Sequence, residues 1–66
     1  MKPKYQNVKV QLTGTDGNAF AVLGAVVKAL RRAGVSHEER IAFQAEATSG
    51  DYDHLLGTCI KWVDVQ

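Results

Sequence analysis

The chain has 66 residues, with eight Lys and Arg side chains against seven Asp and Glu, so its formal net charge at pH 7 is +1. This length leaves room for one small domain spanning residues 1–66. Hydrophobic residues make up 45% of the chain, a fraction that is typical of a folded protein and argues against disorder. The near-neutral charge excludes the overall basic character of a dedicated nucleic-acid binder, but it leaves room for a local basic patch.

The single cysteine, Cys59, cannot form an internal disulfide, which predicts a cytoplasmic protein rather than a disulfide-stabilised secreted one. The longest nearly uncharged stretch, residues 17–27, is too short to span a bilayer. The first residues lack the apolar segment of a signal peptide. We therefore expect no contact with a membrane.

The first predicted element is a strand over residues 7–13, preceded by an N-terminal tail over residues 1–6. Polar and apolar residues alternate strictly along the strand, which is the period of a half-buried strand. This alternation directs Val8, Val10 and Leu12 toward the core.

A dense turn signal, Gly14–Asn18, separates this strand from a predicted helix over residues 19–33. The large apolar residues of the helix share one arc of about 160° at 100° per residue. Arg31 and Arg32 lie in the last turn, where they complement the helix dipole. Gly34 then supplies the left-handed residue that ends many helices.

The second predicted helix runs from His37 to about Thr48, and it begins with a capping box in which Ser36 and Glu39 bond to each other's backbone N–H. Its apolar residues form no single stripe, because Ile41 and Phe43 fall on nearly opposite sides. Such a helix is either packed between two neighbours or presents Phe43 at an interface.

The third predicted helix starts at the cap residue Asp51 and ends near Lys61 or Trp62. The alternating residues 63–65 predict a short strand that pairs with the first strand. The predicted fold class is therefore small α+β in the order β-α-α-α-β, with three amphipathic helices packed on a two-stranded sheet. The side chains expected in the core are Val8, Val10, Leu12, Phe20, Leu23, Val26, Val27, Leu30, Ile41, Leu55, Leu56, Cys59, Ile60 and Trp62.

The residues with reactive side chains have simpler structural roles. Asp51 and Asp53 begin a helix, where acidic residues are expected from the dipole alone. His54 and His37 lack the further ligands and the spacing that a metal site needs. Cys59 falls on an apolar face, where a thiol is inert. The sequence therefore predicts no catalytic residue, no cofactor and no metal, and a protein that is not an enzyme.

Two further features of the sequence bear on binding. The Gly14–Asn18 turn has the position of a phosphate-binding loop but lacks its residue pattern, so a helix-capping turn is expected. A strip of small residues with basic neighbours on the first helix, together with Phe43, is the candidate interface: Asn18, Ala21, Gly24, Ala25, Lys28, Arg32 and Phe43. An ordinary solvent-exposed face would have the same composition.

The interpretation that these features favour is a small accessory protein that binds a second copy of itself or another protein through this helix face. A chain this short has a minimal core, which favours association. The alternative is weak nucleic-acid binding through Lys28, Arg31 and Arg32. Nucleic-acid binding is not favoured, because runs of charge are usually solvated faces.

Three stretches carry a resemblance to a known family: Gly14-Thr15-Asp16-Gly17-Asn18-Ala19-Phe20, Ala29-Leu30-Arg31-Arg32-Ala33-Gly34 and Ser49-Gly50-Asp51-Tyr52-Asp53-His54-Leu55-Leu56. With Cys59 and Trp62-Val63, the chain resembles a family of small uncharacterised bacterial proteins from Val8 to Val65. The resemblance implies a bacterial or phage protein of the cytoplasm, and it assigns no site residues.

Overall fold

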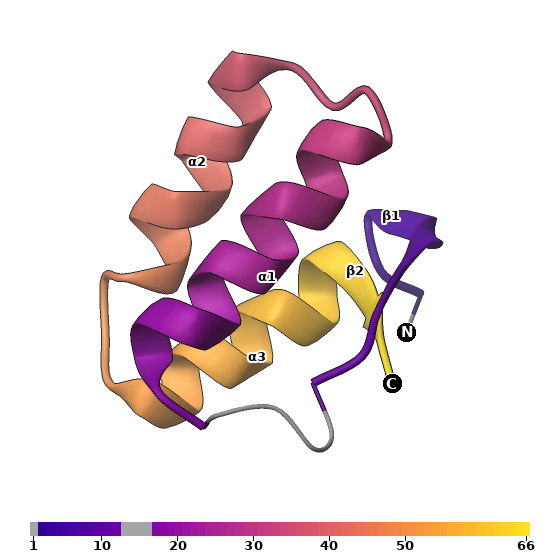
Figure 1. Cartoon of the computed structure of the whole chain (residues 1–66). Coiled ribbons are helices and arrows are strands. Elements are labelled where there is room, and N and C mark those ends of the chain that lie inside the picture. The colour runs from indigo at the N-terminus through magenta and orange to yellow at the C-terminus, as the bar shows by residue number, and fades with distance from the viewer. Residues whose placement is uncertain (1, 13–16) are drawn as a thin grey trace.

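The computed structural model describes residues 2–12 and 17–66, and within them it confirms the predicted α+β fold (Figure 1). The two ends of the chain lie on the same side of the molecule, next to the sheet. None of the helices in these residues has the length and apolar composition needed to cross a membrane. The elements in chain order are β1 (Tyr5–Val10), α1 (Ala19–Arg32), α2 (His37–Ala47), α3 (Tyr52–Trp62) and β2 (Val63–Val65).

Each helix begins at a polar side chain that accepts a hydrogen bond from the first turn. Asn18 accepts from the N–H of Phe20 at 2.8 Å, and Asp51 accepts from the N–H of His54 at 2.9 Å. The predicted capping box is half correct. Ser36 does accept from the N–H of Glu39 at 3.2 Å, but the Glu39 carboxylate binds Lys4 and the Tyr5 hydroxyl instead. These caps satisfy donors that a helix leaves unpaired.

The sheet consists of β1 and β2, paired in parallel across the three-helix connection. The register has an irregularity between Tyr5 and Lys9, after which Lys9 pairs with Asp64 and Val10 with Val65. The strand begins at Tyr5, two residues before the predicted start, so part of the predicted N-terminal tail belongs to the sheet. Hydrogen bonding continues past Val10, since the N–H of Leu12 donates to the carbonyl of Gln66 at 2.9 Å.

The core is a single cluster in which the sheet and all three helices meet. α1 contributes side chains spaced four residues apart, which is one narrow stripe of the helix. The central ring of the cluster is Phe43, whose centroid lies 5.5 Å from that of Trp62 in an edge-to-face arrangement. The buried apolar residues are Val8, Val10, Val22, Val26, Leu30, Phe43, Ala47, Leu55, Cys59, Trp62 and Val63.

Three predicted core residues are instead exposed: Phe20 (84%), Ile60 (60%) and Ile41 (50%). Phe20 lies in the first turn of α1, and the buried stripe of that helix starts only at Val22. α2 packs against α1 and α3 through the side that carries Phe43, so Ile41 on the other side stays in solvent. The prediction of Phe20, Ile41 and Ile60 in the core was therefore wrong, because periodicity defines an apolar arc and neighbouring elements decide how much of it is covered.

Candidate interaction surface

A groove runs between the edge of β1 and the C-terminal half of α1. On the strand side it is lined by five consecutive residues, Asn7 to Gln11. Since successive side chains of a strand point to opposite faces, a wall of consecutive residues is the edge of the strand. The groove encloses about 490 Å³, and its helix side is formed by Ala25, Lys28, Ala29, Arg32 and Ala33.

The helix wall of the groove combines small side chains with long basic ones. Ala25, Ala29 and Ala33 follow one another at intervals of four residues, which places them in one row along the helix. Lys28 and Arg32 are exposed beside this row. The alanines therefore give the groove an apolar wall without bulk, and the basic side chains give it a charged rim.

The strand contributes a third cation, Lys9, which is exposed. Within residues 2–12 and 17–66, the ion pair of the structure joins Lys4 and Glu39, outside the groove. Lys9, Lys28 and Arg32 thus lie around one groove. Asp64 stands opposite Lys9 across the sheet, whereas Lys28 and Arg32 form no ion pair within residues 2–12 and 17–66. Their combined field attracts anionic groups.

The candidate interface predicted from the sequence falls only partly in this groove. Ala25, Lys28 and Arg32 line it, whereas Asn18 is the N-cap of α1. Ala21 and Gly24 are exposed on α1 but do not line it.

Phe43 must be removed from the candidate interface, because its side chain is fully buried. α2 lies against both α1 and α3, so Phe43 fills the space between them. The first of the two sequence interpretations, a helix packed between neighbours, is the correct one.

Sequence reasoning missed the strand side of the groove. Lys9 and Gln11 are separated from Ala25 by more than a dozen positions in the chain, and no local pattern connects them. One signal was available, because the alternation that directs Val8 and Val10 inward also exposes Lys9 and Gln11.

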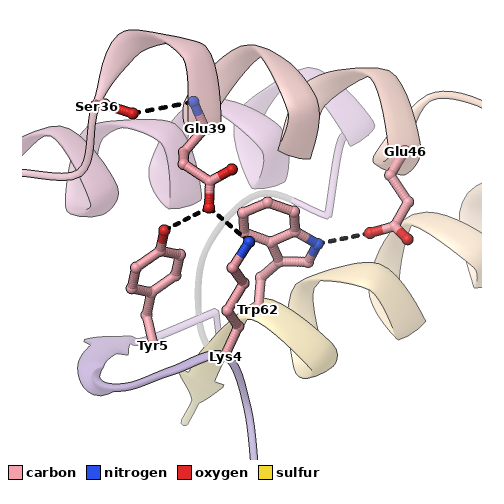
Figure 2. Close-up of polar contacts among 6 residues, drawn as sticks. All are labelled: Lys4, Tyr5, Ser36, Glu39, Glu46 and Trp62. Carbon is pink, nitrogen blue, oxygen red and sulfur yellow. Dashed lines mark hydrogen bonds and ion pairs between the residues drawn. The ribbon is translucent and has the colours of Figure 1, made fainter.

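A second cluster links the N-terminal segment to α2 and α3 (Figure 2). The Glu39 carboxylate accepts a hydrogen bond of 2.7 Å from the Tyr5 hydroxyl and forms an ion pair with Lys4. The Lys4 Nζ lies 4.5 Å from the centroid of the Trp62 ring, a cation–π contact. The Trp62 indole N–H donates to the carboxylate of Glu46.

This cluster shifts the titration of its members in directions that follow from the contacts. Hydrogen bonds from Lys4 and then Tyr5 lower the pKa of Glu39. The bond to Glu39 raises the pKa of Lys4 and also that of Tyr5. Because these groups neutralise and bond one another, the cluster fastens the start of β1 to α2.

The apolar hollow at the other end of the molecule lies where the starts of α1 and α3 meet the end of α2. It encloses about 250 Å³, and the side chains of Phe20, Leu23, Tyr52 and Leu55 contribute to its lining. The predicted role of residues 14–16 in the Gly14–Asn18 turn lies outside the described part of the chain.

The reactive side chains considered from the sequence are held in structural positions. Cys59 is fully buried, and this burial raises the pKa of its thiol, which keeps it protonated and unreactive. The ring of His54 packs on the α2–α3 turn, with Nε2 2.8 Å from the carbonyl oxygen of Glu46 and 3.0 Å from Ser49 Oγ. Among residues 2–12 and 17–66, no three His, Cys, Asp or Glu side chains are grouped to hold a metal.

Comparisons with known proteins find no match to a family model, to a curated protein or to a solved structure. The resemblance to small bacterial proteins therefore stays a prediction. The groove between β1 and α1 has to be interpreted from its own chemistry.

Proposed function

We propose that this protein is a small non-enzymatic interaction protein of the cytoplasm, and that it binds a partner polypeptide in the groove between β1 and α1. One observation carries the proposal: an open strand edge, an alanine row and three cations line the same groove. A strand edge offers backbone hydrogen bonds, and the alanines let another backbone approach closely.

The reactive side chains support a non-enzymatic role. Asp51 caps α3, Cys59 is buried with a raised pKa, and His54 packs on the turn before its own helix. Each of these groups therefore serves the fold. Ser49 Oγ lies 3.0 Å from His54 Nε2, but this hydroxyl donates its proton to the carbonyl of Glu46 at 2.7 Å, so the ring is not placed to activate it.

The alternative is a nucleic-acid surface formed by Lys28, Arg31 and Arg32. All three side chains are exposed at the end of α1, where they can contact phosphates. Arg31, however, does not line the groove. Nucleic-acid binding would use the cations and leave the alanine row and the strand edge without a role, so the polypeptide partner is favoured.

Position-specific photo-cross-linking in the cells that naturally make the protein tests this proposal. A photo-reactive phenylalanine analogue is placed in the full chain at Ala33, which lines the groove, and in a control at Ala42, which is exposed on α2. The expected result is an adduct with a protein chain at Ala33 that is at least about ten-fold more abundant than at Ala42, as selective contact with a groove requires.

Each result decides between the candidate functions. Equal adducts at Ala33 and Ala42, or none at Ala33, would overturn the proposal. A nucleic-acid adduct at Ala33 would replace it with the alternative. That alternative also predicts that affinity for a mixed-sequence duplex falls steeply as salt rises.

A further inference from the structure

We infer that the occupant of the groove is an acidic, extended segment of another protein, which pairs with β1 as a third strand of the sheet. This inference rests on the proposed function and names the class of partner. It follows from the direction of the backbone groups of β1, from the size of the helix wall and from the charge around the groove.

The backbone of β1 shows which polar groups its outer edge offers. The carbonyl of Val10 accepts from the N–H of Gln66 at 2.8 Å, and the N–H of Leu12 donates to the carbonyl of Gln66. Both residues therefore turn their backbone groups toward the C-terminal strand. In a strand, the N–H and C=O of one residue point to the same edge, and those of the next residue point to the opposite edge. The N–H and C=O of Lys9 and of Gln11 therefore point away from β2.

The described sheet ends at this edge. Within residues 2–12 and 17–66 it contains β1 and β2 only, with β2 on one side of β1. The irregular part of the strand precedes Lys9, so the edge that follows is regular. The edge from Lys9 to Gln11 can therefore accept an added strand, which would lie in the groove.

The helix wall has the size that such a strand needs. The side chains that border the added strand are those of Ala25, Ala29 and Ala33. A methyl group is the smallest apolar surface that a helix can offer, so the wall leaves room for apolar side chains of the incoming strand. Burial of those side chains would add to the backbone hydrogen bonds.

Charge selects the kind of segment. Lys9, Lys28 and Arg32 line the groove, with Asp64 opposite Lys9 across the sheet. The ion pair of the described residues lies elsewhere, so Lys28 and Arg32 give the groove its positive charge. A second copy paired through the same edge would bring the same three cations against them, which is repulsive. Glu or Asp side chains on an extended segment would neutralise them. An acidic partner is therefore favoured over a homodimer at this edge.

A synthetic peptide of alternating Val and Glu, blocked at both ends, is the probe for this inference. It is titrated into the isotope-labelled full chain, and the backbone amide resonances are followed. Shifts are expected at Lys9 and Gln11, with little change at Ala42. A peptide N-methylated at every residue should bind about ten-fold more weakly, because neither of its edges can then donate backbone hydrogen bonds to β1.

Charge-reversal variants separate pairing from general attraction. K28E/R32E should weaken the binding of the Val–Glu peptide by about ten-fold or more. The control K2E/K61E makes the same charge change at exposed residues outside the groove and should stay within about two-fold. The amide spectrum of each variant shows that it is folded.

The outcomes are distinct from those of the cross-linking experiment. A peptide that produces no shifts at about 1 mM overturns the inference, and the proposed function stands if Ala33 still cross-links to a protein. Equal binding of the N-methylated peptide excludes strand pairing. Displacement of the peptide by a DNA duplex would show that the cations bind phosphate and would overturn the inference of an acidic protein segment. A self-adduct at Ala33 would show a second copy in the groove and would also overturn the inference. Loss of the Ala33 adduct overturns the proposed function, whatever the peptide does.

Discussion

The rings of Phe43 and Trp62 meet edge to face with their centroids 5.5 Å apart, and this contact joins α2 to the end of α3. Phe43 is fully buried and Trp62 is 8% exposed. Aromatic pairs in this geometry stabilise a core beyond the area that they bury. The contact also positions β2, because Val63 follows Trp62 directly.

Removal of the Phe43 ring should be severely destabilising. We expect F43A to lower the free energy of unfolding by about 3–5 kcal/mol, because it leaves a cavity between two helices. F20A is the matched control, since Phe20 is 84% exposed and its removal should change stability by no more than about 0.5 kcal/mol. Urea denaturation of both variants measures the difference. Equal effects would contradict the placement of the two rings.

The hydrogen bond between Trp62 and Glu46 predicts a second pair of variants. E46A removes the acceptor of a largely buried indole N–H and should cost about 1–3 kcal/mol. E46Q keeps an acceptor oxygen at the same position, so its cost should be clearly smaller. Chemical denaturation followed by the fluorescence of the single tryptophan reports both. An E46A variant as stable as the unsubstituted chain would show that the bond is unimportant.

The contact of Glu39 with Lys4 and Tyr5 predicts a pH dependence of stability. A lowered pKa in the folded state stabilises the protein above the ordinary value of 4.5, and this contribution disappears as pH falls through the folded value. The raised pKa of Lys4 stabilises the folded state at pH values below the ordinary Lys value of 10.5. This stabilisation is lost as pH rises through the pKa that Lys4 has in the folded state. The contact should therefore be strongest between about pH 5 and pH 10.

E39Q tests this window, with E38Q as the matched control in the same helical turn. Both variants remove one acidic charge near the start of α2, so the helix-dipole effect is shared. E39Q should be less stable than E38Q at neutral pH. The stabilities of the two variants should converge as pH falls to about 3, below the ordinary range of carboxyl pKa values. Thermal denaturation at a series of pH values measures this. A difference that is constant with pH would contradict the ion pair.

Two glycines of the chain should respond to alanine in opposite directions. Gly34 has φ of +85°, where a Cβ is strained, so G34A should cost about 1–2 kcal/mol. Gly24 lies inside α1 with open space around an added Cβ, so G24A should gain about 0.5–1 kcal/mol. Urea denaturation distinguishes them. Stabilisation by G34A would show that α1 ends in another way.

The burial of Cys59 predicts that its thiol is protected in the native state. Reaction with a disulfide reagent at pH 8 (roughly neutral to mildly basic) should be at least about 100-fold slower in the folded chain than in urea, because the thiolate is disfavoured and inaccessible. Absorbance of the released thiol gives both rates. Rapid reaction without unfolding would reopen the question of a reactive cysteine.

Local signals in the sequence were sufficient for the order of the elements and for the starts of the helices, but not for the bounds of the first strand, which spans Tyr5–Val10 rather than residues 7–13. Ser36, Asp51 and Gly34 act within a few residues of their own position, so their roles follow from the residues around them. The second strand was predictable for the same reason, because its alternation is visible at residues 63–65. Ala25, Lys28 and Arg32 were identified as a surface because they share one helix face.

The sequence alone determined which segments become helices and strands in this protein, since propensity, capping and periodicity act over one or two turns. Only the tertiary structure decided which apolar side chains are covered, placing Phe43 inside and Ile41 outside. It also brought Lys4 to Glu39 and placed Lys9 and Ala29 on the same groove, although the chain separates both pairs widely. The physical reason is that burial and charge pairing depend on the packing of whole elements, which no local pattern contains.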